Sequence, residues 1–180
     1  KRGDDYIDVS GQSFRDLLAG KLGSLQGERA TLSDWANHLT TIFPEVRLKR
    51  YIEMRGADSG PWRVLPALPA FWVGLLYDDA ALDAAWQLVK GWTAEERQSL
   101  RDQVPRLGLQ AQLRSSSALE IARECLRLAR AGLARRARLD RDGDDETQYL
   151  QPLEASAERG ETPAEHLLAQ YHGPWNRSVE

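Results

Sequence analysis

Hydrophobic and polar residues largely alternate over residues 46–52, with the two-residue period of a β-strand. Val46, Leu48 and Ile52 fall on one face of such a strand. Because successive side chains of a strand point to opposite faces, the other face is polar. The pattern predicts a half-buried strand over residues 46–54, whose polar face carries Arg47, Lys49, Tyr51 and Glu53.

Short elements are predicted before this strand. Residues Tyr6 to Val9 have the composition of a short strand, and Ser13 is placed to cap a helix that runs to about Ala19. A second helix is expected to start at a Ser33 cap and to end near Phe43, because the residue before a proline disfavours helical dihedrals. The intervening loop is marked by Gly20, Gly23 and Gly27.

The pattern after Gly56 is almost entirely helical. The segment 66–77 is apolar on nearly every side, which is typical of a buried helix, and about twelve residues are too few to cross a bilayer. We place the boundary between a sheet-bearing part (residues 1–62) and a helical part (residues 63–180) near Trp62. Helices are predicted over 66–77, 79–90, 93–103, 116–139, 146–158 and 162–172.

Composition narrows the class of protein but not its function. The 180 residues are 42% hydrophobic and 28% charged, as in an ordinary soluble domain with a real core. The formal net charge of −3 implies no general affinity for polyanions. The sequence contains no apolar run of about 18 residues, so it predicts no membrane span. The only cysteine, Cys125, excludes an intrachain disulfide and a cysteine-based metal site.

Two charged segments suggest binding functions that their details do not favour. Helix 116–139 is rich in arginine, as a nucleic-acid-binding helix would be, yet Glu120 and Glu124 precede Arg123 and Arg127 by one turn and predict intrahelical ion pairs. The acidic segment 140–146 does not have glycine and glutamate at the sixth and twelfth positions that a calcium loop requires. We therefore interpret it as a turn in which Asp144 or Asp145 starts the next helix.

Glu53 and Arg55 are the strongest candidates for chemistry. Two residues apart on an extended chain, they emerge on one face about 7 Å apart. A carboxylate beside a guanidinium can serve a phosphate bound to Mg²⁺, the first holding the metal and the second neutralising phosphoryl charge. The alternative is an exposed ion pair of little consequence.

Several long segments together resemble one family, the proteobacterial and plant type of glutamate–cysteine ligase. The most extensive is residues 38–58, which reads His-Leu-Thr-Thr-Ile-Phe-Pro-Glu-Val-Arg-Leu-Lys-Arg-Tyr-Ile-Glu-Met-Arg-Gly-Ala-Asp. The resemblance continues over residues 65–78, and it includes residues 13–16 and 171–176, so it spans nearly the whole chain.

The resemblance implies an ATP-dependent enzyme that joins the γ-carboxylate of glutamate to the amine of cysteine, the first step of glutathione synthesis, with ATP and Mg²⁺ as cofactors. It also implies an α+β fold, mostly helical with a few antiparallel strands, as the C-terminal part of a glutamine-synthetase-like structure. In that wider superfamily a Glu-x-Arg at a strand end supplies a metal ligand and a phosphate-binding arginine. Glu53 and Arg55 match that pair, and Asp58 matches the acidic residue just beyond.

Family members are several hundred residues long, so the resemblance also implies that this chain is a fragment whose partner is the missing N-terminal portion of the enzyme. We expect the chain alone to be inactive, helix 66–77 to support the Glu53–Arg55 strand, and no nucleic acid or membrane to be bound. The plant branch is associated with redox control through cysteine pairs, which one cysteine cannot form internally, so we expect a bacterial-type, cytoplasmic enzyme. Further candidates for binding substrate or phosphate are Arg47, Lys49, Trp62 and Arg63.

Two other functions remain open on the sequence. The chain can be a non-catalytic helical module that supplies a back wall or a subunit contact to a site completed elsewhere. A helical nucleic-acid binder rests only on the arginine-rich helix, and salt-dependent retention on DNA would reveal it.

Overall fold

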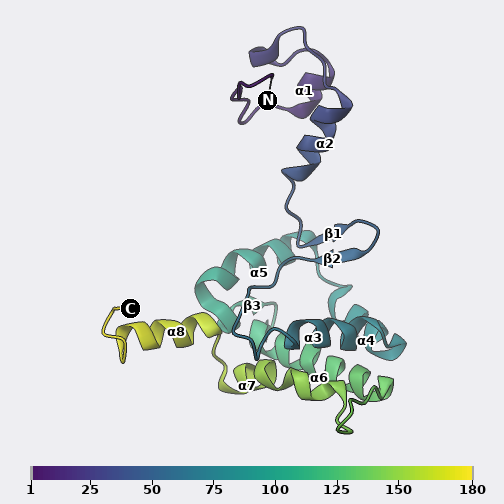
Figure 1. Ribbon diagram of the computed structural model, residues 1–180, viewed down its shortest axis with the longest axis vertical. Coiled ribbons are helices and arrows are strands. Elements are labelled where there is room, and N and C mark those ends of the chain that lie inside the picture. Colours follow the sequence, from purple (N-terminus) through teal and green to yellow (C-terminus); the bar gives the residue numbers. More distant parts are fainter. Residues whose placement is uncertain (1, 180) are drawn as a thin grey trace. The chain divides into compact units, whose positions relative to one another are not determined.

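The structure is a computed structural model that describes residues 2–179. The chain divides into two compact units, residues 1–57 and residues 58–180 (Figure 1). The first unit contains the helices α1 (Phe14–Leu18) and α2 (Leu32–Thr40), a 3-10 turn η1 (Gly23–Leu25), and the strands β1 (Val46–Leu48) and β2 (Ile52–Met54).

A small hydrophobic core holds α1 and the following turn together. Leu17, Leu22 and Leu25 are buried, and Phe14 and Ala30 pack against them. The predicted cap of α1 is confirmed, because the Ser13 hydroxyl accepts a hydrogen bond from the Arg15 amide at 3.2 Å. Two other predictions are wrong. Residues 6–9 form no strand, and α2 is capped by Thr31 rather than Ser33.

The Thr31 cap has a clear physical reason. Asp34 lies three residues after Thr31, so its carboxylate accepts the Thr31 amide at 2.9 Å while the Thr31 hydroxyl accepts the Asp34 amide at 3.1 Å. This reciprocal capping box satisfies two amides that the first turn of a helix leaves unpaired. A Ser33 cap would have no acidic residue three positions later.

The predicted continuous strand over 46–54 is wrong, because these residues form a hairpin. β1 and β2 are antiparallel, with Val46 opposite Met54, Arg47 opposite Glu53 and Leu48 opposite Ile52. The Lys49 amide donates to the Tyr51 carbonyl at 2.9 Å and closes the turn. The register keeps apolar residues on one face and Arg47 with Glu53 on the other. The predicted division into an apolar and a polar face is therefore correct, although the residues form two strands rather than one.

The second unit is built from helices and small turns. The predicted helices after Gly56 are confirmed within a few residues, except that the first part of segment 146–158 is a 3-10 turn and that α5 continues to Leu107. Its elements are α3 (Ala67–Leu76), α4 (Asp79–Val89), α5 (Ala94–Leu107), η2 (Gly108–Gln110), β3 (Gln112–Leu113), β4 (Ser116–Ser117), α6 (Ala118–Arg136), η3 (Glu146–Leu150), α7 (Gln151–Arg159) and α8 (Pro163–His172). The mostly helical α+β class, with two small antiparallel sheets, is also confirmed.

The core of this unit is centred on α3 and α6, which pack along each other (Figure 1). Leu133 and Leu150 are fully buried there, and the predicted burial of α3 is confirmed by Ala67, Ala70 and Leu75. α3 and α6 approach so closely that Gly74 and Gly132 meet at their backbones. Among the described residues, no helix combines the length and the apolar character that crossing a membrane requires.

The arginines of α6 bind acceptors on neighbouring elements. Arg130 donates to both Glu154 carboxylate oxygens at 2.6 Å, and Arg135 donates to both oxygens of Asp78 at 3.0 and 2.6 Å. Arg123 donates two hydrogen bonds to the Ala157 carbonyl. Of the two predicted intrahelical ion pairs, Glu124 with Arg127 forms as expected. Glu120 instead accepts the Ser117 amide in the capping box of α6.

The acidic segment after α6 is a turn, as predicted. Asp145 caps η3 by accepting the Thr147 amide at 2.9 Å, and Asp140 accepts the amides of Asp142 and Asp144. These carboxylates are therefore bound to local amides, and the prediction that Asp145 starts the next helical element is confirmed.

A methyl group at the α3–α6 crossing should destabilise the second unit. A Cβ at Gly74 would overlap the Ala129 carbonyl oxygen, and a Cβ at Gly132 would overlap the Gly74 carbonyl oxygen. We expect Gly74→Ala or Gly132→Ala to lower the free energy of unfolding by about 3 kcal/mol, since backbone cannot move aside as a flexible side chain can. Urea unfolding measures this. Gly91→Ala, whose new Cβ would lie 3.8 Å from Arg114, is the control, and equal stability of all the variants would contradict the prediction.

Acid should weaken the contact between α4 and α6. The Arg135 guanidinium, together with the Ala81 amide, lowers the pKa of the Asp78 carboxyl from 3.8 to about 2. A group with a lower pKa in the folded state stabilises fully above its ordinary pKa and loses that contribution as the pH falls to the folded value. Asp78→Asn should therefore lower the free energy of unfolding at pH 6, with a difference from the wild type that shrinks below about pH 4. Urea titrations at pH 6 and below about pH 4 measure this difference. Asp83→Asn, an exposed change on the same helix, is the control, and its difference from the wild type should not change with pH in this way.

Candidate functional site

Glu53 and Arg55 lie together at the end of β2. The Arg55 Nε is 3.8 Å from Glu53 Oε2, and both side chains are about 30% exposed, at 27% and 32%. The Arg55 amide donates to the Glu45 carbonyl at 2.8 Å, so the backbone pairing of the hairpin extends one step beyond the strand. The prediction that the two side chains share one face is confirmed by this contact.

Two charged atoms of this pair lack hydrogen-bond partners although they are buried. They are the Oε2 of Glu53 and the Nη1 of Arg55. A buried charged atom without a partner is costly, and such atoms concentrate where a ligand completes the site. The carboxylate oxygen presents negative charge to a cation, and the guanidinium nitrogen presents a donor to an anion. The roles of the two residues toward a metal ion and a phosphate remain a prediction.

Sequence reasoning missed two neighbours of Arg55. The guanidinium carbon lies 5.5 Å from the centroid of the Phe43 ring, in the range of a cation–π contact. Glu45 lies opposite Arg55 across the hairpin, and a Cβ on Gly56 would come within 3.0 Å of a Glu45 carboxylate oxygen. Their proximity follows from the hairpin register, which pairs Val46 with Met54 and so places residue 45 beside residue 55, and a prediction of one continuous strand cannot contain it.

Two of the weaker candidates also belong to the hairpin. Lys49 Nζ is 3.5 Å from Glu53 Oε1 and 5.8 Å from the Tyr51 ring centroid, so it adds positive charge beside the carboxylate. Arg47 is opposite Glu53 in the register, but its side chain donates to the Ile42 carbonyl at 3.2 Å. That bond uses one of the five N–H donors of the guanidinium.

The other three candidates belong to the second unit. Asp58 begins it, and Trp62 and Arg63 lie in the turn before α3, where Trp62 is 86% exposed. Their predicted part in substrate binding remains a prediction. So does the expected support of the Glu53–Arg55 strand by α3.

The described part of the chain does not supply a complete metal site. No group of three or more histidine, cysteine, aspartate or glutamate side chains is close enough there to hold a metal ion. Mg²⁺ prefers six oxygen ligands, a few of which are usually carboxylates. Glu53 can contribute one ligand, and the others would have to come from substrate, water or residues outside those described.

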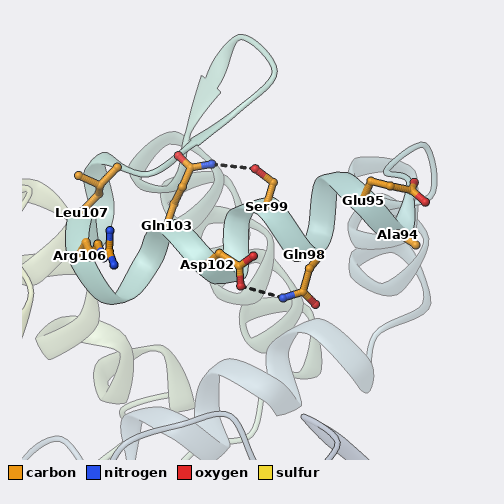
Figure 2. A pocket seen from close by; sticks show the side chains of 8 residues that line it. All are labelled: Ala94, Glu95, Gln98, Ser99, Asp102, Gln103, Arg106 and Leu107. Atoms are coloured by element: carbon orange, nitrogen blue, oxygen red, sulfur yellow. Dashed lines mark hydrogen bonds between the residues drawn. The ribbon is translucent and has the colours of Figure 1, made fainter.

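A cavity of the second unit offers no comparable chemistry. It has a volume of about 900 Å³ and follows one side of α5 (Figure 2). Its polar side chains pair with one another, since Gln98 donates to Asp102 at 2.8 Å and Gln103 to Ser99 at 3.1 Å. The lining residues are Ala94, Glu95, Gln98, Ser99, Asp102, Gln103, Arg106 and Leu107, and none was a candidate from the sequence.

Comparison with known proteins settles the family. The model of glutamate–cysteine ligase family 2 matches residues 3–180. The chain belongs to this family. A chloroplastic glutamate–cysteine ligase from Nicotiana tabacum is 53% identical over 175 residues, which are 97% of this chain and 32% of that protein. Arabidopsis thaliana and Oryza sativa subsp. indica have chloroplastic ligases that are 52% identical over 99% of this chain, and 33% and 35% of their lengths are covered.

The chain spans about one third of the length of the ligases it matches. The resemblance inferred from the sequence is confirmed, with the plant enzymes as its relatives. The predicted cytoplasmic location is wrong, because these relatives are named chloroplastic enzymes. The error has a physical source: a single cysteine excludes an internal disulfide, and that exclusion does not distinguish one compartment from another.

Proposed function

We propose that this chain is part of an ATP-dependent ligase that joins the γ-carboxylate of glutamate to the amine of cysteine. Its relatives are named glutamate–cysteine ligases. The observation that carries the proposal is the Glu53–Arg55 ion pair on the hairpin, in which two buried atoms, Glu53 Oε2 and Arg55 Nη1, have no hydrogen-bond partner. The negative carboxylate is complementary to a Mg²⁺ ion, and the positive guanidinium is complementary to a phosphoryl group.

The proposed reaction has two steps. A γ-carboxylate oxygen of glutamate attacks the γ-phosphorus of ATP, and ADP leaves with the electrons of the broken phosphorus–oxygen bond. The product is γ-glutamyl phosphate. The amine of cysteine then attacks the carbonyl carbon of this mixed anhydride, loses a proton and expels phosphate, which leaves a γ-amide bond.

Glu53 and Arg55 have separate tasks in this scheme. Glu53 offers a carboxylate oxygen to Mg²⁺, and a bound Mg²⁺ neutralises charge on the phosphate oxygens. Arg55 donates from Nη1 to the phosphoryl group, where negative charge is spread in the transition state. Since that contact strengthens during transfer, loss of Arg55 should lower turnover more than substrate binding. Lys49 holds the other oxygen of Glu53 and contributes positive charge.

Phe43 and Glu45 are the positioning residues of this proposal. The Phe43 ring limits where the guanidinium can lie, and the Glu45 carbonyl fixes the Arg55 backbone. Arginine carries a large rotamer entropy, so restricting it before substrate binds favours the reactive geometry. Weaker substrate contacts are proposed for Arg47, Asp58, Trp62 and Arg63.

The alternative function is a helical module without catalysis of its own. It is favoured by the coverage of only one third of the relatives and by the lack of a three-ligand metal group among the described residues. The two functions agree for a longer ligase and differ for this chain alone. We expect the chain alone, with Mg·ATP, glutamate and cysteine, to release no ADP above background.

ADP release by a longer protein tests the proposal. This chain would be joined to the portion of the tobacco relative that lies outside the match, and ADP would be measured with glutamate and Mg·ATP, with and without cysteine. We expect cysteine to stimulate release, and Glu53→Gln to reduce it by at least about 100-fold, because the amide cannot neutralise the metal. Glu161→Gln, an exposed change after α7, is the matched control. Equal activity of Glu53→Gln and the control would refute the assigned role.

Substitution of Phe43 separates positioning from folding. Phe43→Leu keeps an apolar side chain but removes the π face, so we expect kcat to fall by about 5-fold, in the range of an exposed cation–π contact, with KM nearly unchanged. Phe43→Tyr keeps the π face and should restore kcat. A Phe43→Leu protein with unchanged kcat, or a Phe43→Tyr protein as impaired as Phe43→Leu, would show that the ring does not position Arg55.

A further inference from the structure

The helix α2 contacts its own unit mainly through polar residues and turns much of its apolar side outward, although the Trp35 ring also lies 5.5 Å from the Phe14 ring. Asp34 and His38 are its two partly buried residues, and no residue of α2 is fully buried. Asp34 forms an ion pair with Arg2 at 2.8 Å, and the His38 ring stacks on the Phe14 ring with centroids 4.3 Å apart. A surface helix normally does the reverse and turns its apolar stripe to the core.

Four large apolar residues form a line on the outer side. Leu32 is 88% exposed, Trp35 47%, Leu39 46% and Ile42, just past the helix, 48%. Their spacing of three, four and three residues keeps them on one side of a helix, as in the contact line of a helix pair. We call these four residues the α2 stripe.

The unit has too little core to explain this arrangement by itself. Three leucines are buried in residues 2–57, with Phe14 and Ala30 packed against them. A unit of this size buries a smaller fraction of its surface than a full domain and is correspondingly marginal. A contiguous exposed apolar line on such a unit indicates a surface that another structure covers.

Two observations identify what covers the stripe. The chain spans about one third of the relatives it matches, so those relatives contain some two thirds of a ligase that this chain does not. The hairpin in the same unit is a sheet of only two strands among the described residues, so neither outer edge pairs with a further strand there. Both observations indicate that this unit continues into a larger structure.

A membrane surface fits less well. Helices that lie on membranes carry lysine and arginine on the polar face, and α2 contains neither. Its polar residues are Ser33, Asp34, Asn37, His38 and Thr40.

We propose that the α2 stripe is the surface by which residues 2–57 dock onto an apolar face of the ligase polypeptide that lies outside this chain. Leu39 and the exposed part of Trp35 lie at its centre and anchor the contact, as large side chains at the centre of an interface do. The inference rests on the proposed function only for the identity of the partner. The docking surface requires no catalytic turnover.

Photocrosslinking identifies the occupant directly. p-Benzoylphenylalanine would replace Leu39 in this chain joined to the remaining portion of the tobacco relative, and Leu168, a 57% exposed leucine on α8, in a matched control. After irradiation, mass spectrometry locates the crosslinked peptides. We expect position 39 to crosslink to the tobacco-derived portion at least about 10-fold more than position 168. Crosslinks to a second copy, to residues 58–180, or to nothing would overturn the proposal.

Hydrogen exchange provides a second measurement that does not depend on the probe. In the joined protein, the amides of residues 31–42 should exchange at least about 100-fold more slowly than in the chain alone, because docking suppresses local opening. Leu39→Glu should abolish this protection, and Leu168→Glu should leave it unchanged. Equal exchange in both proteins would overturn the docking surface. A joined protein that is protected but releases no ADP would instead refute the proposed function.

Discussion

The backbone contact between α3 and α6 is the constraint on which the second unit depends. Gly74 and Gly132 remove the side chains that would otherwise hold two helices 8–10 Å apart, so main chain meets main chain. That closeness buries Leu133 and Ala129 completely and fixes the direction of α6. The ion pairs from α6 to Asp78 and Glu154 then form at the periphery of a crossing that is already set.

The sequence predicted helices better than it predicted their connections. Segment 66–77 was located within a residue or two, because a continuous apolar run of that length is more typical of a buried helix than of a strand. The hairpin was missed because its turn, Lys49-Arg50-Tyr51, contains none of the glycine, proline or asparagine that usually mark a turn. Its register preserves the alternation, so a hairpin and a strand give the same pattern. The Thr31 cap was missed although its partner Asp34 stands at the required spacing.

The candidate site was predictable in its charged residues and not in their surroundings. Glu53 and Arg55 followed from a strand period and a family motif. In the hairpin their side chains are in contact, and their roles stay a prediction. Phe43 and Glu45 are separated from Arg55 by a turn, and their proximity depends on the pairing of two strands. A local pattern carries no information about which strand lies opposite. Asp58, Trp62 and Arg63 belong to the other unit, and their part in binding stays a prediction.

The ion pairs made by the arginines of α6 affect how strongly this helix can bind a polyanion. Of the 24 basic residues only four are lysines, and a guanidinium can bind two acceptor oxygens in one plane where an ammonium cannot. Arg127, Arg130 and Arg135 each bind both oxygens of a carboxylate in this way. A nucleic acid approaching the helix would have to break these pairs before its phosphates could be neutralised. Few counterions would be released in exchange, so the entropy gain that drives such binding is largely absent from a helix that looks basic in sequence.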